Sequence, residues 1–293
     1  MAKMVHEEIV WKADGRPVRL GVTRAGEGPS VLLLPALSSI SAREEMEPLQ
    51  ARLSPWFSTL SVDWPGFGTL PRPRVEWRPE IYWGFLDFLL KEFVRPVATI
   101  TAGHGASYVL GVGADGPPTG ALCLLSPTWH GPLPTMAGKR APWQDSIVKA
   151  VDLPIVGPLL YRLNVNRPVI GMMARGHVYE NPAFLTPERM AAKRAVTGAK
   201  GARHGSVRFV TGALDLFTGR EGFLGEAENL GVPVMAVWAA HAPAKSRAEM
   251  EALGALPNVE SEVLPRGKLS FYEEFPDDAA TAILPFLHKA AAR

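Results

Sequence analysis

Apolar and polar residues follow a strand–helix rhythm along most of the chain. Short, almost uniformly apolar runs are typical of strands buried on both faces of a parallel sheet, and apolar positions spaced three and four apart predict helices. The run 31–34 is of this kind, and further strands are expected at 58–62, 97–102, 121–125, 232–238 and 259–264. Helical patterns lie between them, at 41–53, 79–93, 108–112, 245–256 and 277–292. Two further strands, 9–12 and 18–23, flank the turn formers Asp14-Gly15. The order predicts an α/β fold: a mostly parallel central sheet flanked by helices.

The rhythm breaks between residues 126 and 205. Prolines recur there, strand patterns vanish, and apolar helical segments appear, at 147–151, 155–163, 169–173 and 187–195. We therefore predict a helical cap or lid at 126–205, inserted after the sixth strand, with 1–125 and 206–293 forming the core domain. Such an insertion is expected to cover the crevice in which open α/β sheets bind ligands.

Several motifs stand in a familiar order around this insertion. The segment Asp63-Trp64-Pro65-Gly66-Phe67-Gly68 fits a D-x-x-G-x-G loop, and the strand 97–102 leads directly into Gly103-His104-Gly105-Ala106-Ser107 and a helix. Over about residues 16–290 the chain resembles the α/β-hydrolase superfamily, in which this strand–turn–helix is the nucleophile elbow. The resemblance implies that fold and a pocket beneath the cap.

The resemblance also implies where a catalytic triad belongs, and the residues there depart from the pattern. The middle of the elbow motif is Gly105, which has no side chain. The loop that usually carries the acid has Ala242, and the frame that usually carries the histidine has Lys268. The chain thus resembles a member with a degenerate triad. Backbone amides of Leu37 and Ala106 are the oxyanion-hole donors that the resemblance implies.

Two hypotheses from different classes follow. The first is a non-hydrolytic pseudoenzyme that binds an apolar small molecule under the cap. The second is an atypical hydrolase, lyase or cyclase that uses a general base and the oxyanion site. The cap could instead serve as a protein interface. Candidate lining residues are Trp129, His130, Met172 and Met173; candidate catalytic residues, besides Lys268, are His104, His241, Ser107 and Tyr272.

Composition and short motifs limit the classes of partner, cofactor and compartment that we expect. The net charge is +2 and the sequence shows no Lys/Arg-rich run, so nucleic acid is not expected as a partner. We predict neither a metal nor a cofactor, because no His/Asp/Glu cluster has metal-ligand spacing and no glycine-rich loop fits a phosphate. The single Cys123 lies in an apolar strand and excludes an internal disulfide. No apolar window reaches the length of a membrane span, and the N-terminus lacks a signal-peptide pattern. A cytoplasmic protein is therefore expected, with its oligomeric state open.

Overall fold

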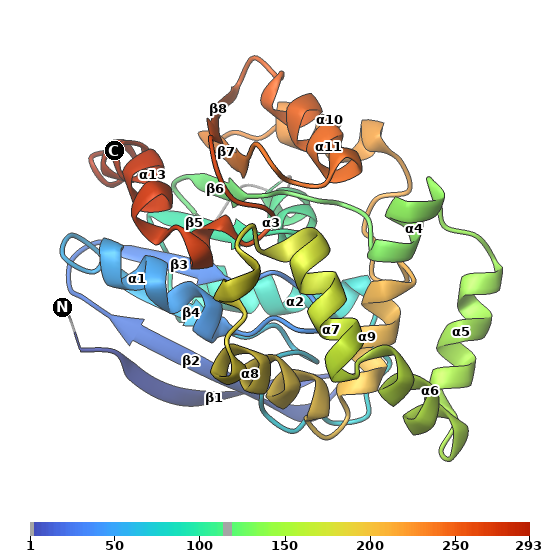
Figure 1. Cartoon of the computed structure of the whole chain (residues 1–293). Coiled ribbons are helices and arrows are strands. Elements are labelled where there is room, and N and C mark those ends of the chain that lie inside the picture. The colour runs from blue at the N-terminus through green and yellow to red at the C-terminus, as the bar shows by residue number, and fades with distance from the viewer. Residues whose placement is uncertain (1–2, 114–118) are drawn as a thin grey trace.

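The computed structural model describes residues 3–113 and 119–293. Its centre is an eight-stranded sheet in the order β1-β2-β4-β3-β5-β6-β7-β8 (Figure 1). The strands β3 to β8 run parallel to one another, whereas β2 pairs antiparallel with both β1 and β4 at one edge. The predicted mostly parallel sheet is thereby confirmed. The strands are β1 Val5–Ala13, β2 Arg16–Ala25, β3 Ser30–Leu34, β4 Ser58–Val62, β5 Ala98–Ala102, β6 Leu122–Leu125, β7 Val234–Ala239 and β8 Val259–Leu264.

Helices cover both faces of the sheet, as the uniformly apolar central strands require. One face carries α1 (Glu47–Leu53) and α13 (Pro276–Ala291), which bury Leu49 and Phe286 against it. The other face carries α2 (Pro79–Asp87), α3 (Gly105–Gly113), α10 (Arg220–Glu228) and α11 (Ala244–Gly254). Short helices η1 (Arg43–Met46), η2 (Phe88–Phe93) and α12 (Phe271–Glu274) extend α1, α2 and α13.

A run of helices separates β6 from the last part of the core. These are α4 (Pro132–Ala137), α5 (Trp143–Asp152), α6 (Val156–Asn164), α7 (Arg167–Met173), η3 (Ala174–Val178), η4 (Pro182–Phe184), α8 (Pro187–Gly198) and α9 (Ala202–Val210). We call α4 to α9 the helical insertion. It begins and ends close to the predicted 126–205, except that α9 continues to Val210.

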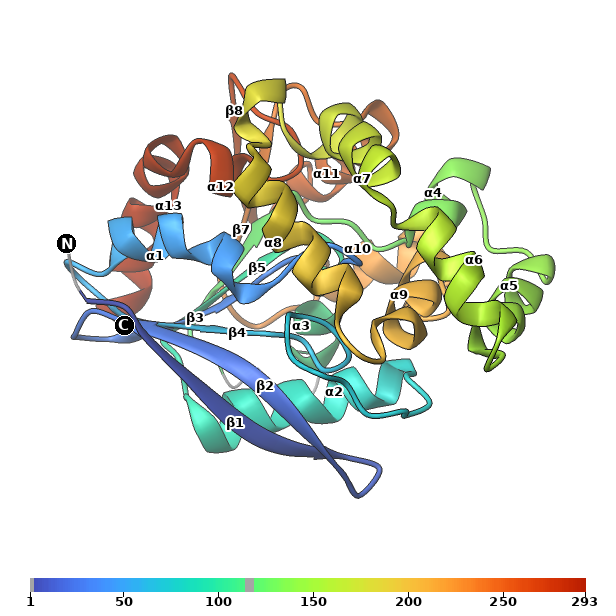
Figure 2. The ribbon, with the colours of Figure 1, turned by 60° about the horizontal axis from the view of Figure 1, so that its bottom comes forward.

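The helical insertion lies over the loops that follow the carboxyl ends of the strands (Figure 2). Ser206 of α9 bonds Ser39 in the loop after β3, and Arg72 in the loop after β4 bonds the carbonyl of Val196 in α8. This is the side on which open α/β sheets place their ligands. Among the described residues, no helix is long and apolar enough to cross a membrane.

Candidate functional site

The turn between β5 and α3 is the geometric centre of the candidate site. β5 ends at Ala102, α3 begins at Gly105, and the residue between them with a left-handed backbone is Gly103, at φ +56°. Its amide donates to the Leu125 carbonyl at 2.9 Å, which ties the turn to β6. A sharp left-handed turn here is the elbow that lifts one residue above the sheet.

The elbow residue is therefore Gly103, and the assignment of this position to Gly105 was wrong by two residues. A Cβ on Gly105 would lie 2.4 Å from Thr101 Oγ1 and 2.9 Å from Trp64 Cζ2, so Gly105 faces packed core. A Cβ on Gly103 would instead meet only Ala36 Cβ at 3.4 Å and Thr128 Oγ1 at 4.0 Å. The two glycines flank His104. The spacing of the elbow motif alone is compatible with either glycine at the nucleophile position.

The oxyanion assignment moves with the elbow. The amide that follows the elbow residue belongs to His104, whereas the Ala106 amide donates to the Gly103 carbonyl at 3.2 Å inside the first turn of α3. Leu37 is buried in the loop after β3, next to Ala36, which faces Gly103. The β3 loop thus lies against the elbow, but the amide of the expected donor Ala106 is used by its own helix.

The loop after β7 carries the predicted acid position. Ala242 is buried, and its amide donates to the Ala239 carbonyl at 3.0 Å. The neighbouring His241 is half-exposed and places Nδ1 3.1 Å from the Glu180 carboxylate of the helical insertion. His241 therefore faces the insertion, where its partner is an acid.

The loop after β8 carries the predicted histidine position. The Lys268 ammonium donates to the carbonyls of Arg175, at 2.6 Å, and Gly176, at 3.3 Å, within η3. Counting back from Pro276 places Leu269, rather than Lys268, where the G-H-x-x-x-x-E-x-P frame has its histidine. Leu269 packs against the apolar cluster that includes Ala106 of α3.

These two loops join the helical insertion in a continuous polar seam. Backbone amides of Leu269 and Ser270 donate to the carbonyls of His177, at 3.3 Å, and Val178, at 3.1 Å. The Gly267 amide donates to the Glu180 carboxylate, and this bond lowers the pKa of Glu180. Further bonds in the seam come from Glu274, which accepts from the amides of Glu180 (2.8 Å) and Asn181 (2.7 Å), and from Tyr179, whose hydroxyl donates to Glu273 at 2.6 Å. Most of these bonds use backbone amides or carbonyls. They hold residues 175–181 of the insertion to the loop after β8 and to α12.

The remaining predicted catalytic side chains are buried in the core. His104 lies between the rings of Tyr108 and Phe209, with Nε2 3.2 Å from the Leu214 carbonyl. Ser107 donates to the Thr128 carbonyl at 3.3 Å and is fully buried. Tyr272 is buried as well, and burial raises the pKa of its phenol far above the ordinary range, which removes it as a base near neutral pH.

Trp129 and His130 form part of a second polar group beside the elbow. The His130 Nδ1 lies 3.0 Å from Asp215, and His104 Nε2 lies 3.6 Å from the same carboxylate. Asp215 also accepts from the Gly131 amide at 2.9 Å. Trp129 is buried, packs at a tilt against the His130 ring, and donates to Glu249 at 2.9 Å. The group packs the start of the helical insertion against the core.

A third group, which the sequence analysis missed, is a buried ionic cluster. Lys193 of α8 bonds Glu45 of η1 and lies 3.6 Å from Glu273 of α12, with all three side chains almost fully buried. Burial raises the pKa of Glu45 to about 7. Burial alone would lower the pKa of Lys193, but the Glu273 and Glu45 carboxylates raise it well above its usual value. In sequence, Lys193 follows two alanines in a helix rich in charge, a pattern typical of a solvated face.

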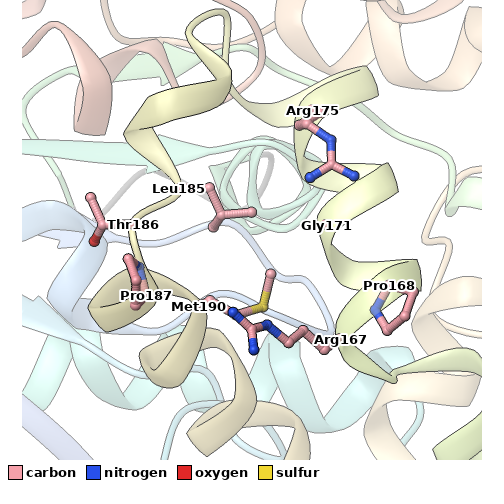
Figure 3. A pocket seen from close by; sticks show the side chains of 8 residues that line it. All are labelled: Arg167, Pro168, Gly171, Arg175, Leu185, Thr186, Pro187 and Met190. Atoms are coloured by element: carbon pink, nitrogen blue, oxygen red, sulfur yellow. The ribbon is translucent and has the colours of Figure 1, made fainter.

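Met172 and Met173 do not line a pocket beneath the insertion. They are 62% and 41% exposed on α7, and the expectation for these two residues was therefore wrong. A cavity of about 370 Å³ lies instead between α7 and α8 (Figure 3). Its walls combine apolar side chains with two guanidinium groups, and the lining residues are Arg167, Pro168, Gly171, Arg175, Leu185, Thr186, Pro187 and Met190.

Comparison with known proteins supports the fold. No protein-family model and no curated protein matches the sequence. Solved structures match it over nearly the whole chain. The Cfl2 protein of Burkholderia cenocepacia has a TM-score of 0.74 at 18% identity, covering 96% of each chain. The Cif epoxide hydrolase of Acinetobacter nosocomialis has a TM-score of 0.73 at 13% identity, covering 96% of this chain and 89% of its own. A thermophilic esterase of Thermogutta terrifontis has a TM-score of 0.73 at 15% identity, covering 98% and 99%. This chain is an α/β-hydrolase-fold protein.

Proposed function

We propose that the protein is a non-hydrolytic member of this fold that binds an apolar small molecule carrying an acidic group. The observation that carries the proposal is Gly103. It occupies the left-handed elbow between β5 and α3, and it has no side chain that could attack a substrate. Removing a complete triad costs on the order of 10⁶ in rate in a serine hydrolase.

The loops after β7 and β8 support the same proposal. In a hydrolase of this fold they supply the acid and the histidine that activate the nucleophile. Here His241 pairs with Glu180, Lys268 bonds the carbonyls of η3, and Leu269 is apolar. Each loop is engaged in holding the helical insertion to the core.

The cavity between α7 and α8 supports the ligand class. Leu185 and Met190 offer apolar surface, and Arg167 and Arg175 offer guanidinium groups. Among the described residues, neither arginine has an acidic side chain within ion-pair distance, and an anionic ligand group would supply that partner. A few fixed polar groups in an otherwise apolar pocket are typical of small-molecule sites.

The alternative, an enzyme that uses His104, His241 or Lys268 as its base, has less support. All three already have protein partners, and His104 is shielded from solvent by Tyr108 and Phe209. A general base must reach the proton that it removes.

The first experiment is an intact-mass spectrum of the purified protein before and after a fluorophosphonate probe, with an active serine hydrolase treated in parallel. We expect an adduct on the control enzyme only. A stoichiometric adduct on this protein, mapped to one serine, would overturn the proposal. Native mass spectrometry of the same sample is expected to retain a small molecule that carries an acid group.

A further inference from the structure

Positive charge is concentrated in the helical insertion. Residues 126–205, which contain all of the helical insertion except the end of α9, have eleven Lys and Arg against four Asp and Glu, although the whole chain has a net charge of only +2. The rest of the chain is therefore net acidic. Asp152 is the single acidic residue in the sequence 146–179. Its carboxylate bonds Arg208 at 2.7 Å and also His204. The outer part of the insertion thus presents a locally basic surface.

An apolar stripe lies on the same part of the insertion. We call Leu153, Ile155, Val156, Leu159 and Leu163 the α6 patch. Ile155 is 88% exposed, Leu159 61% and Leu163 59%. Val156, Leu159 and Leu163 recur at three- and four-residue spacing, which aligns them along one side of α6. The other side of α6 packs on α5 and α9.

Such a surface is uncommon on a protein that has no partner for it. Single exposed apolar side chains are ordinary, but five of them within residues 153–163 are typical of an interaction site. Both views place α5 and α6 at the margin of the molecule, on the side away from the N-terminus (Figures 1 and 2). Neighbouring structure therefore does not shield the α6 patch from an extended surface.

We propose that the α6 patch docks the protein on an anionic lipid bilayer. The apolar side chains enter the boundary between headgroups and acyl chains, as an interfacial amphipathic helix does. Lys149 precedes Leu153 by four residues, and Arg162 lies between Leu159 and Leu163 on α6; both are exposed and have no acidic partner among the described residues. Their long side chains reach headgroup phosphates while their apolar stems stay with the patch.

Charge complementarity favours a bilayer over a second copy of the chain as the occupant. In a symmetric dimer the α6 patch would meet itself, and Lys149 and Arg162 would face the same cations of the partner. An anionic bilayer offers an apolar layer for the side chains of the α6 patch and negatively charged headgroups for Lys149 and Arg162.

The test is co-sedimentation of the full chain with sucrose-loaded vesicles. One set contains phosphatidylcholine alone, and the other contains phosphatidylcholine mixed with phosphatidylglycerol. We expect binding to the mixed vesicles and little to the neutral ones, with binding weakened by added salt.

Two matched pairs of variants assign the effect to the patch. The double variant Ile155→Ser/Leu159→Ser should bind the mixed vesicles at least about tenfold more weakly, whereas Val10→Ser, at an equally exposed apolar site on β1, should bind as the wild type does. Lys149→Gln/Arg162→Gln should weaken binding by a similar factor, and Lys12→Gln/Arg16→Gln on the β1–β2 hairpin should not.

Light scattering on the same samples without lipid completes the test. We expect the wild type and Ile155→Ser/Leu159→Ser to have the same mass. The proposal is overturned if the wild type ignores both kinds of vesicle. A stable dimer that dissociates in Ile155→Ser/Leu159→Ser would also overturn it, because the α6 patch would then cover a second copy.

Discussion

His241, in the loop after β7, lies 3.1 Å from the carboxylate of Glu180 in the helical insertion. The same carboxylate accepts the Gly267 amide from the loop after β8. One acidic residue of the insertion thus joins the two loops that supply acid and histidine in hydrolases of this fold. Glu180 therefore fastens the helical insertion to the core at both of these loops.

Removing this carboxylate should loosen the seam locally. We expect Glu180→Gln to lower the free energy of unfolding by about 1 kcal/mol, because it weakens a charge-assisted bond to the Gly267 amide. Hydrogen exchange is expected to speed up at the amides of Gly267, Leu269 and Ser270. Glu262→Gln, at an exposed site on β8, is the control and should change neither quantity. Unchanged exchange at all three amides in Glu180→Gln would contradict the role assigned to Glu180.

The two glycines of the elbow should respond differently to a methyl group. Gly105→Ala places its Cβ against Thr101 and Trp64, and overpacking of this kind costs about 2–3 kcal/mol. Gly103→Ala has room for its Cβ and should cost about 1 kcal/mol for the left-handed backbone. Chemical denaturation of both variants measures the difference. The reverse order would return the elbow position to Gly105.

A nucleophile restored at the elbow should remain idle without a histidine. We expect Gly103→Ser to give no burst of product from an activated ester, because Leu269 and Lys268 provide no base. Gly103→Ser/Leu269→His is the informative comparison, since it returns a base to the frame counted from Pro276. Fluorophosphonate labelling of this double variant, and not of Gly103→Ser, is the expected result. Equal labelling of both would show that another residue already acts as the base.

Much of the architecture could be predicted from the sequence. Strands 58–62 and 259–264 have the predicted bounds, because turn formers bound each of them on both sides. The Asp14-Gly15 turn joins β1 and β2 as expected, with both residues at positive φ. The run of helices between β6 and β7 was predicted on other grounds. Its recurring prolines and helical apolar spacing differ from the strand–helix rhythm of the remaining chain.

The site could be predicted only in outline. Which glycine forms the elbow depends on where β5 ends. Because glycine stands on both sides of His104, the elbow motif can be aligned with the sequence in two ways. The contacts of Glu180 and of Lys193 join residues far apart in the chain, and nothing in their local pattern indicates burial or partners. The exposure of Met172 and Met173 depends in the same way on how α7 lies on the core, which periodicity in so short a helix does not determine.

The buried cluster of Glu45, Lys193 and Glu273 should make stability depend on pH. The pKa of Glu45 is raised by burial to about 7 in the folded chain, and it is near 4.5 in an unfolded one. The folded state therefore holds an extra proton between these values, and this contribution to stability is present at low pH and is lost as pH rises toward 7. Asp63, whose pKa is raised to about 6 mainly by burial, acts in the same direction, whereas His204, whose pKa burial lowers, acts in the opposite one.

The variant Glu45→Gln isolates the first of these contributions. Its stability relative to wild type should improve by on the order of 2 kcal/mol between pH 5 and pH 8, since glutamine resembles the protonated acid at every pH. Urea denaturation at a series of pH values measures this difference. Glu228→Gln, at an exposed site, should follow the wild-type curve. A constant difference between Glu45→Gln and wild type across the range would contradict a raised pKa at Glu45.

The cavity between α7 and α8 makes the proposed ligand class testable. A long-chain carboxylic acid should bind, and the alcohol of equal chain length should bind at least about tenfold more weakly, because only the acid pairs with Arg167 and Arg175. Arg175→Gln should remove this preference, and Met190→Trp should weaken both ligands by filling the cavity. Arg194→Gln, at an exposed site on the same helix as Met190, should bind as the wild type does. Isothermal titration of each variant with both compounds separates the two effects. Equal affinity of the wild type for acid and alcohol would leave the arginines without the assigned role, and unchanged binding in Met190→Trp would place the ligand elsewhere in the molecule.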